Sequence, residues 1–527
     1  MTDLTYDLKN DVEHVEEGVD KPHGTIIPYP RTLRDMPDPP SPAALALGFE
    51  LQKQDMSHGF FKAMGLGWRM LLMSLPYMIS SLGGGYDSGS SGMIQSMPSF
   101  LLMFGGFDAV SETLALPSNW VALWQALACL STAIGALSCT TLLEKLGPRR
   151  TNFTASIVVL PGIALCACAT SRVILLFGKT FIGLSLGIFV ASSSNFVAES
   201  AVGPVRAFCS VSIGMFFLVG VMLGLATGFG LIDVIDSGFI MPALSLVGLL
   251  FVPTSPIYLV KRNQPHEALK SLTKLHGSKT SADCLRARLA VIQHTVALEA
   301  EQKKHKGSPS FRDLWSNPID RRRTITNAGI WLAYQASGAV FLANGLYFLL
   351  VFGVDVVTGG QIIIAMFTLP ILLNLILPYV LDRLGRRTLF VWGNLIQRVH
   401  AMGLEEVSTA LMLTLGCLGF AKSHGAKLAV AVLMQLGNGT IQLSTGAPVY
   451  ALNAEISSMR LRALSQSFGL SMGYLAQFAL TMAVPYIYQA PGWLLAKTAL
   501  YANILAITPQ IFAGTSAMAV VWGYFYS

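Results

Sequence analysis

Charged side chains are scarce in this chain of 527 residues. Asp, Glu, Lys and Arg make up 12% of it, against roughly 25% in an ordinary soluble domain. Apolar residues make up 53%, and the mean hydropathy is +0.55. A protein folded in water has too little interior for so much apolar side chain, so lipid must surround most of the chain. This excludes a cytosolic enzyme, a disordered scaffold and a nucleic-acid-binding protein, in spite of the net charge of +7.

Cysteine is also sparse. The chain has seven Cys, with no Cys-x-x-Cys or His-spaced pair among them. All but Cys284 lie within apolar stretches, where free Cys acts as a small core side chain. The sequence therefore predicts no metal site, no disulfide framework and no cofactor.

Long apolar stretches follow one another from residue 68 onward. A helix needs about 20 mostly apolar residues to cross roughly 30 Å of hydrocarbon. Twelve stretches approach or exceed this length, near 68–92, 119–143, 152–171, 173–198, 207–230, 238–260, 325–352, 360–381, 388–420, 428–452, 465–488 and 500–525. We therefore expect an all-α membrane protein with twelve transmembrane helices.

Basic residues indicate which connections face the cytoplasm. The connections after even-numbered spans are basic, whereas the opposite ones are mainly acidic. By the positive-inside rule, both termini and the long middle connection are cytoplasmic. The first 58 residues contain no apolar core of a signal peptide, so we expect no cleavage there. The expected domains are a cytoplasmic tail (1–67), a first six-helix bundle (68–260), a cytoplasmic linker (261–324) and a second six-helix bundle (325–527).

Two different motifs recur in both halves of the chain. The sequence LEKLGPRRT at 143–151 returns as LDRLGRRT at 381–388, each time between the second and third span of a half. A Glu-x₆-Arg motif also occurs twice, between the fourth and fifth spans, at Glu199 with Arg206 and at Glu455 with Arg462. Six-helix halves repeated in parallel, with a substrate site between them near the midplane, are typical of major facilitator transporters.

Further motifs carry a family resemblance. They are Gly85-Tyr86-Asp87, Val252-Pro253-Thr254-Ser255-Pro256, Tyr258-Leu259, Gln335-x-x-Gly338 and Tyr347-Phe348. With the repeated motifs, they make residues from roughly 70 to 525 resemble the sugar porter family of the major facilitator superfamily, and most of all the fungal maltose (α-glucoside) permeases. The resemblance implies a secondary transporter that works by alternating access on a sugar-like small molecule, coupled to protons.

The chain departs from the family pattern at three places. Thr254 stands where the family usually has Glu, and Tyr334 takes the first of two paired Gln positions in span seven. The stretch 212–230 in span five holds no Gln or Asn, although the family often has a Gln there. These differences concern the substrate more than the transport activity.

Asp87 and Lys179 are the candidate proton-coupling residues. A carboxylate at the centre of a membrane helix costs at least about 2.5 kcal/mol, so its default interpretation is functional. The resemblance implies that Asp87 takes up the proton and that its partner is the basic residue twenty positions before Glu199, which is Lys179. The alternatives are an Asp wetted by the outer vestibule and a Lys that extends to the membrane interface.

Charged residues at the cytoplasmic helix ends are the candidate gate. The resemblance implies that they form networks that close the cytoplasmic side in the outward-open state. They are Glu199, Arg206, Arg149, Arg150, Glu455, Arg462, Arg386 and Arg387. The alternative is that the positive charges only keep these loops inside.

Polar and aromatic side chains within the spans are the candidate substrate contacts. They are Gln335, Tyr334, Asn344, Gln442 and Tyr450. Tyr450 lies five residues before Glu455, where many hexose-transporting relatives have Trp. Polar side chains in membrane helices often hydrogen-bond to neighbouring helices, so we expect roughly half of them to be structural. The aromatic positions favour a ligand larger than a monosaccharide, with an apolar face.

The function expected from the sequence is a proton-coupled symporter of a sugar, such as an oligosaccharide or glucoside. We expect a monomer in the plasma membrane, with no nucleic-acid partner and no enzymatic activity. One alternative is a uniporter or exporter of a polyol-like or secondary metabolite. Another is a non-transporting sugar sensor, although sensors of this fold tend to carry a long cytoplasmic tail that this sequence does not show.

Two segments do not fit the family pattern. Residues 397–406 interrupt the ninth span with charges, and residues 501–510 lengthen the approach to the twelfth. One hypothesis is that both are translated intron sequence, and the other is that both are inserted loops. Sequencing the transcript distinguishes the two, because a transcript that encodes both segments rules out the first.

Overall fold

The protein is described by a computed structural model. It describes residues 18–20, 26–28, 30–34, 36–57, 60–95, 97–108, 113–201, 204–228, 234–277, 281–307, 309–335, 356–384, 446–458 and 460–489. This part of the chain is almost entirely helical. It forms two compact units, which we call unit 1 (1–73, 199–205 and 253–310) and unit 2 (74–198, 206–252 and 311–527).

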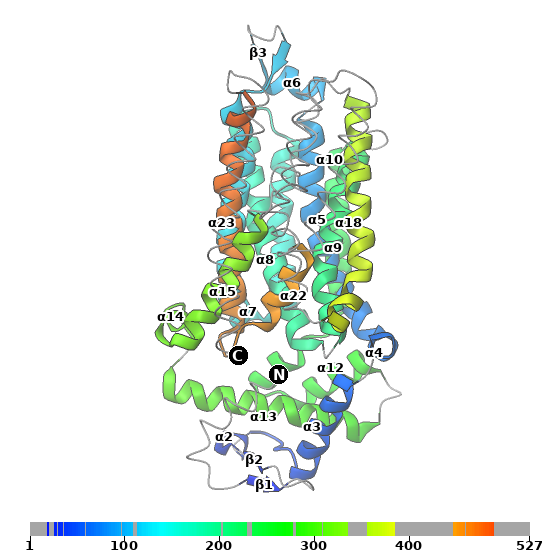
Figure 1. The fold of residues 1–527 in the computed structure, drawn as a ribbon, viewed down its shortest axis with the longest axis vertical. Helices are drawn as coiled ribbons and strands as arrows, with labels where there is room; N and C mark the ends of the chain where they lie inside the picture. The colour runs from blue at the N-terminus through cyan, green and yellow to red at the C-terminus, as the bar shows by residue number, and fades with distance from the viewer. Residues whose placement is uncertain are drawn as a thin grey trace, which may run out of the picture. The chain divides into compact units, whose positions relative to one another are not determined.

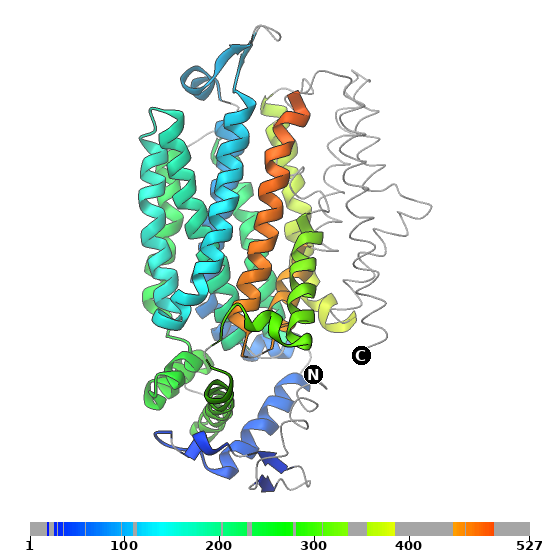
Figure 2. The same cartoon turned by 90° about the vertical axis from the view of Figure 1, so that its left-hand side faces the viewer.

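Unit 2 holds the long apolar helices. From the first half of the chain they are α5 (Trp68–Ile94, whose start belongs to unit 1), α7 (Ser118–Ala167), α8 (Arg172–Ser200), α9 (Pro204–Gly228) and α10 (Val234–Phe251). From the second half they are α15 (Pro318–Tyr334), α18 (Val356–Leu384), α22 (Ala447–Glu455) and α23 (Arg462–Gln489). The long helices run side by side (Figure 1), and Figure 2 shows α23, in orange, alongside α7, in cyan.

Short elements complete unit 2. The helix α6 (Pro98–Phe104) precedes a hairpin of β3 (Gly106–Asp108) and β4 (Thr113–Ala115), which pair antiparallel. They lie at one end of the helices (Figure 1). The helix α14 (Asp313–Ser316) precedes α15 and is joined to the α22–α23 connection by an ion pair of 2.7 Å between Asp313 and Arg460.

Three described helices are long and apolar enough to cross a membrane, at Asn119–Ala167, Arg172–Ser200 and Val205–Thr227. The predicted spans 388–420 and 500–525 lie outside the described residues, as do most of 325–352 and 428–452 and the segments 397–406 and 501–510. The number of twelve spans therefore stays a prediction from the sequence.

A break in α7 explains one repeated motif. The second and third predicted spans appear as one long helix that is interrupted at Gly147, with φ 78° and ψ 165°. This φ lies in the left-handed region, where glycine has no side-chain penalty. Pro148 then restarts the helix, since proline is well tolerated in a first turn. In the first copy of the motif, Gly147 and Pro148 therefore make the turn between two predicted membrane spans.

Glycines let α5 and α9 approach closely. A Cβ added at Gly85 of α5 would lie 1.9 Å from the carbonyl oxygen of Phe217 on α9. A Cβ added at Gly220 of α9 would lie 2.1 Å from the carbonyl oxygen of Leu82 on α5. Small residues permit such backbone contact in membrane bundles, where packing replaces the hydrophobic effect between helices. This contact fixes the part of α5 that carries Asp87.

Unit 1 is built from the N-terminal segment and the middle connection. Its elements are β1 (Gly18–Asp20) paired antiparallel with β2 (Ile26–Pro28), α2 (Arg31–Arg34), α3 (Pro42–Ser57), α4 (Phe60–Leu66), α11 (Pro256–Lys261), α12 (Pro265–His276) and α13 (Ala282–Lys306). Apolar side chains of α11, α12 and α13 form a core, among them Val260, Leu272 and Leu289. The sequence predicted a cytoplasmic linker at 261–324 and a tail at 1–67, but not the helices that precede α5.

The end of α12 carries a histidine with an altered proton affinity. Burial lowers the pKa of His276 to about 4; the nearby Arg288 acts in the same direction, and Asp55 opposes it. Between about pH 4 and 6.5 the unfolded chain therefore binds a proton that the folded unit does not. This contribution to stability is fully present above about pH 6.5 and is lost as the pH falls toward 4.

We therefore expect the hydrogen-exchange protection of α12 to decrease as the pH falls from 7 to 5. The protection is corrected for the change of the intrinsic exchange rate with pH. His276→Gln should flatten this dependence, because Gln takes up no proton. The exposed His266, changed to Gln in the same way, is the control. Equal pH dependence in the wild type and His276→Gln would show that another group is responsible.

Candidate functional site

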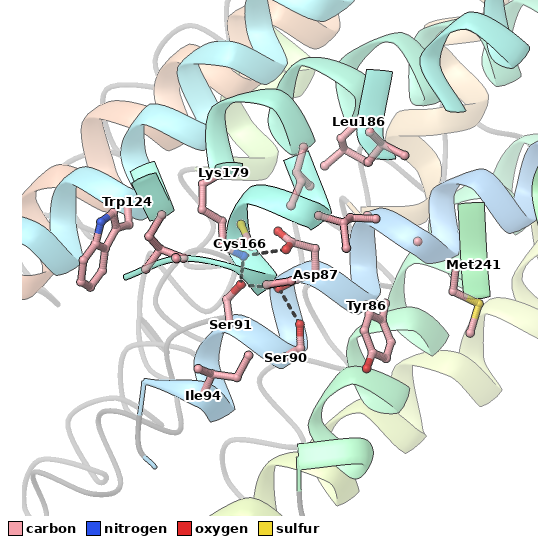
Figure 3. Close-up of a pocket in the computed structure, with 18 of the residues that line it drawn as sticks. Tyr86, Asp87, Ser90, Ser91, Ile94, Trp124, Cys166, Lys179, Leu186 and Met241 are labelled. Carbon is pink, nitrogen blue, oxygen red and sulfur yellow. Dashed lines mark hydrogen bonds and ion pairs between the residues drawn. The ribbon is translucent and has the colours of Figure 1, made fainter. Parts of the chain in front are cut away.

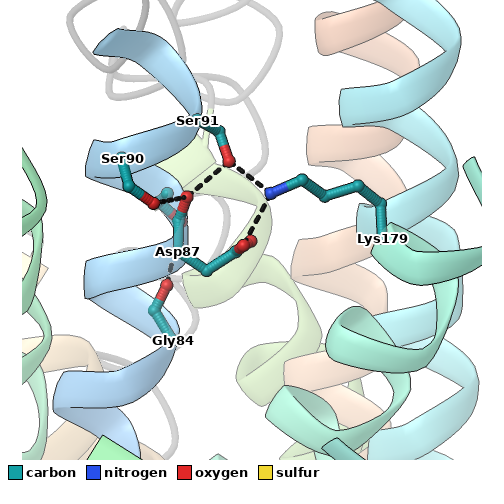
Figure 4. A network of polar contacts seen from close by, with 6 residues as sticks. Gly84, Asp87, Ser90, Ser91 and Lys179 are labelled. Carbon is teal, nitrogen blue, oxygen red and sulfur yellow. Dashed lines mark hydrogen bonds and ion pairs between the residues drawn. The ribbon is translucent and has the colours of Figure 1, made fainter. Parts of the chain in front are cut away.

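Asp87 and Lys179 form an ion pair inside unit 2. Asp87 lies on α5 and Lys179 on α8, and Nζ of Lys179 is 2.6 Å from Oδ1 of Asp87. Their side chains are only 27% and 15% exposed. The lysine also donates to the hydroxyl of Ser91, one turn further along α5 (Figure 4). Ser90 and Ser91 donate to the carbonyl oxygen of Asp87, which holds both hydroxyls beside the pair.

The pair is an arrangement that one proton can switch. Removing either partner from a desolvated ion pair leaves an uncompensated charge, so the two side chains stabilise each other. Protonating Asp87 would neutralise the carboxylate and leave Lys179 to interact with Ser91 or another partner. Proton uptake by Asp87 would therefore break this contact, and proton release would re-form it.

The ion pair lies at the wall of a cavity of about 950 Å³. The cavity is lined by residues of α5, α6, α7 and α8, with Thr227 of α9 and Met241 and Pro242 of α10. Figure 3 shows Asp87, Ser91 and Cys166 facing it together with Lys179. Among the described residues, those that line the cavity come from the first half of the chain, and Tyr334, Gln335 and Tyr450 are not among them. Within the described part of the chain, the candidate coupling residues therefore lie apart from these three candidate substrate contacts.

A buried polar network holds the helices around this cavity. The amide of Asn152 on α7 donates to Ser80 of α5 at 2.9 Å and accepts from Ser192 of α8 at 3.0 Å. The hydroxyls of Ser80 and Ser245 on α10 lie 2.6 Å apart. These bonds join four helices of the first half, and all their members are paired, which is typical of a structural network.

An aromatic cluster joins the two halves. The rings of Trp331 and Tyr334 on α15 have centroids 6.3 Å apart, and those of Trp331 and Tyr450 on α22 are 5.3 Å apart, both nearly perpendicular. Tyr450 also contacts Gly214 of α9, where an added Cβ would lie 2.8 Å from its ring. Two predicted substrate residues of the second half, Tyr334 and Tyr450, thus both contact Trp331, and Tyr450 also meets the first half at Gly214.

The other predicted substrate residues are only partly described. Gln335 directly follows α15, next to Tyr334, and is 5% exposed. Asn344 and Gln442 lie outside the described residues. Among the described residues, no group of three or more His, Cys, Asp or Glu side chains is placed to hold a metal ion.

The predicted gate residues make contacts at helix ends. Arg462, at the start of α23, donates to the carbonyl oxygen of Ala198 near the end of α8 at 3.5 Å, which links the two halves. Arg149 donates to the carbonyl oxygen of Leu250 on α10 at 3.0 Å. Both contacts place a cation at the negative end of a helix dipole.

The remaining gate candidates are placed as follows. Glu199 and Ser255 both belong to unit 1, and Glu199 accepts a hydrogen bond of 2.7 Å from the hydroxyl of Ser255. Arg150 is exposed, Arg206 lies in the first turn of α9, and Glu455 is the last residue of α22. Arg386 and Arg387 lie outside the described residues.

Three residues of these sites were missed by the sequence reasoning. Ser91 lies four positions after Asp87, on the same face of a helix, so its spacing was a usable signal. Trp331 has the same spacing of four from Gln335, a predicted contact. Gly214 gave no signal, because its contact with Tyr450 depends on how the two halves pack.

The long apolar helices of unit 2, with a partly buried ion pair and an aromatic cluster between them, define a helical membrane transport protein. A family model described as "Sugar (and other) transporter" matches residues 73–527. The chain therefore belongs to this sugar transporter family of the major facilitator superfamily. The resemblance seen in the motifs and the expected fold class are both confirmed. The protein is a multi-pass integral membrane transporter, and transporters of this family are carriers rather than enzymes.

Individual relatives agree with this assignment. The MFS transporter fmqE of Aspergillus fumigatus is 29% identical over 464 residues, which cover 86% of this chain and 82% of that protein. The general alpha-glucoside permease of Saccharomyces cerevisiae is 23% identical over 451 residues, or 83% of this chain and 69% of that protein. The proton:xylose symporter XylE, solved with 6-bromo-6-deoxy-D-glucose, matches with a TM-score of 0.66 at 17% identity, covering 85% of this chain and 95% of XylE.

Proposed function

We propose that the protein is a proton-coupled symporter of a sugar, of the oligosaccharide or glucoside class, that works by alternating access. The observation that carries this is the ion pair of Asp87 and Lys179 at a cavity inside the first half. Charges kept within a membrane-spanning segment are costly unless they have a role, and proton uptake by Asp87 is the simplest one. The similarity to a proton:xylose symporter supports the same role.

The substrate contacts we propose are Gln335 and the two tyrosines of the aromatic cluster, with Asn344 and Gln442 as further candidates. The indole nitrogen of Trp331, in the same cluster, is buried and has no hydrogen-bond partner among the described residues. A buried donor left unpaired costs about 1–3 kcal/mol, so a hydroxyl of a ligand or a water would be bound favourably there. Aromatic faces beside an unpaired donor fit a glucoside better than a small polar monosaccharide.

The orientation that we propose places both termini and unit 1 in the cytoplasm, with the protein in the plasma membrane as a monomer. A second candidate function is export of a polyol-like or secondary metabolite. Its support is that Tyr334 occupies a family Gln position, which makes the cluster more apolar than a hexose site. Direction of transport separates the two candidates.

Uptake measurements test the proposal. We expect labelled maltose or an aryl glucoside to accumulate in cells that lack other sugar transporters, and a protonophore to abolish the accumulation. Glucose should compete at least tenfold more weakly than the aryl glucoside, because each hydrogen bond or stacking contact that it lacks removes about 1 kcal/mol or more. Equal competition by glucose, unaffected by Tyr334→Gln, would favour an ordinary hexose carrier. Efflux without uptake would favour the exporter.

The gate proposal makes a separate prediction. Glu199→Gln and Glu455→Gln should each loosen the cytoplasmic closure, and a bias of about 1 kcal/mol would raise the inward-facing population about fivefold. The probe is Ala451→Cys. Ala451 is 1% exposed and packs against Val211 and Leu377, between the two halves.

Alkylation of the introduced Cys, read by mass spectrometry of its peptide, should become faster in both variants. Glu267→Gln, which removes an exposed acid of unit 1 paired with Lys270, is the matched control. Unchanged alkylation in both Glu199→Gln and Glu455→Gln would leave membrane topology as the only role of these charges.

A further inference from the structure

The N-terminal segment, expected to be a polar tail, is built into unit 1. Two of its side chains, Leu33 of α2 and Leu45 of α3, are 0% exposed. Leu45 packs on Ala290 of α13, with Phe49 and Val291 beside them. We call the described residues from Pro30 to Ser57 the strap, since they follow α13 along much of its length (Figure 1).

One end of the strap is held near the C-terminal end of α13. The hydroxyl of Thr32 donates to the carbonyl oxygen of Ala297 at 2.9 Å and to Glu301 at 3.3 Å. The backbone N–H of Thr32 donates to the same carboxylate at 3.1 Å. Thr32 is itself buried, so the contact to Ala297 is shielded from water and the two contacts to Glu301 are partly shielded.

The middle of the strap is shaped to fit α13. The buried amide of Gln293 donates to the carbonyl oxygen of Asp38 at 3.0 Å, and Asp38 adopts a positive φ of 62° to present it. Gly48 lies so close that an added Cβ would be 2.3 Å from the carbonyl oxygen of Ala287. This fit between backbones is specific to the two segments.

The other end of the strap is held by charge. Asp55 of α3 lies 2.7 Å from Arg288 of α13, with both side chains mostly buried. The contacts thus run along α13 from Ala287 to Glu301, which is about 21 Å of helix. A contact of this length fixes the direction of the α13 axis relative to the strap, in addition to the position of α13.

Further contacts of unit 1 connect α13 to the candidate gate. Glu299 of α13 forms an ion pair of 2.8 Å with Lys261 of α11. The turn before α11 is fixed at both sides. Its Thr254 carbonyl accepts from Ser271 of α12 at 2.6 Å, and its Ser255 hydroxyl donates to Glu199 at 2.7 Å. The strap, α13, α11 and Glu199 therefore form one continuous series of contacts.

We propose that the strap is a regulatory clamp. When it is docked on α13, the series of contacts holds Ser255 against Glu199 and keeps the cytoplasmic gate closed. When it is released, α13 and α11 gain freedom, Glu199 loses a fixed partner, and the inward-facing state becomes more populated. The effect on transport rests on the gate role proposed above for Glu199, whereas the docking itself does not.

The experiment uses charge reversal and rescue in the full-length protein. We expect Asp55→Arg or Arg288→Asp alone to raise the hydrogen-exchange rate of α3, because two like charges then meet in a half-buried site. In the Ala451→Cys background, each should also raise the alkylation rate about three- to tenfold. Combining both reversals keeps the same two charges in contact and should restore both readouts to within twofold. Glu267→Lys, which reverses an exposed charge of the same unit, should change neither.

Leu45→Asp is a second release variant, which acts on the apolar contact instead of the ion pair. If α3 exchange rises in either variant while alkylation at position 451 is unchanged, the strap is only a structural element and the proposal is wrong. If neither variant raises α3 exchange, the strap does not detach and the proposal is also wrong.

If Glu199→Gln alters alkylation and strap release does not, Glu199 acts in the gate independently of the strap. If Glu199→Gln has no effect and strap release does, the strap acts through another residue and the gate assignment has failed.

Discussion

Replacing Asp87 with Asn should abolish pH-dependent accumulation of substrate while leaving exchange of labelled for unlabelled substrate intact. One proton moved across 100 mV is worth about 2.3 kcal/mol, or about fiftyfold accumulation. Asn cannot take up this proton, so the variant should only equalise the concentrations on the two sides. Because Asn retains a side-chain oxygen that can accept from Lys179, it disturbs the packing of α5 and α8 very little. The measurement is uptake and counterflow in proteoliposomes with an imposed pH gradient.

Matched variants make this result specific. Asp283→Asn changes an exposed carboxylate in α13 and should accumulate substrate normally. Lys179→Gln should lose accumulation and also stability, because it leaves the carboxylate of Asp87 without its cation. Normal accumulation by Asp87→Asn would rule out Asp87 as the coupling residue. Loss of counterflow as well as accumulation would instead indicate a structural role.

Gly85→Ala should lower the stability of the protein by about 1–3 kcal/mol, the usual cost of forcing extra volume into a packed interior. Its Cβ would lie 1.9 Å from the backbone oxygen of Phe217, which cannot rotate away as a side chain would. The helices α5 and α9 must therefore move apart. The midpoint of thermal unfolding, measured in detergent by size-exclusion chromatography, should fall accordingly.

The same helix supplies the control for this prediction. Gly92 also lies in α5, but among the described residues no atom of another helix lies within 4 Å of a Cβ added there. Gly92→Ala should leave the unfolding midpoint unchanged or raise it slightly, since alanine is favoured over glycine within a helix by about 0.5–1 kcal/mol. Equal midpoints for the two variants would mean that α5 and α9 are not in close contact.

Much of the candidate coupling site was predictable from the sequence. A charge within an apolar stretch is rare because of its cost in lipid, so Asp87 stood out without any structure, and the family resemblance pointed to Lys179 as its partner. Tyr334 and Gln335 were found from their positions in a span and from the family pattern. Their partners were harder to find. Trp331 and Gly214 look like any other apolar or small residue of a membrane helix, and nothing local marks them.

The N-terminal segment shows a different limit. Its composition is polar and rich in proline, which is typical of a flexible tail. Leu33 and Leu45 are isolated apolar residues there, too few to form a core by themselves. Leu45 is buried against Ala290 of α13, which lies more than 200 residues later in the chain. A pattern within one segment cannot show what a distant segment supplies.

The sequence by itself determined that the protein lies in a membrane, that its spans fall into two related halves and that it belongs among the sugar transporters. These properties follow from hydropathy and repeated motifs, which act locally or at a fixed offset. The tertiary structure decided that Asp87 and Lys179 face a cavity apart from the aromatic cluster, that Tyr450 contacts Gly214, and that the strap docks on α13. Each of these depends on contacts between segments far apart in the chain, which packing selects and local pattern does not encode.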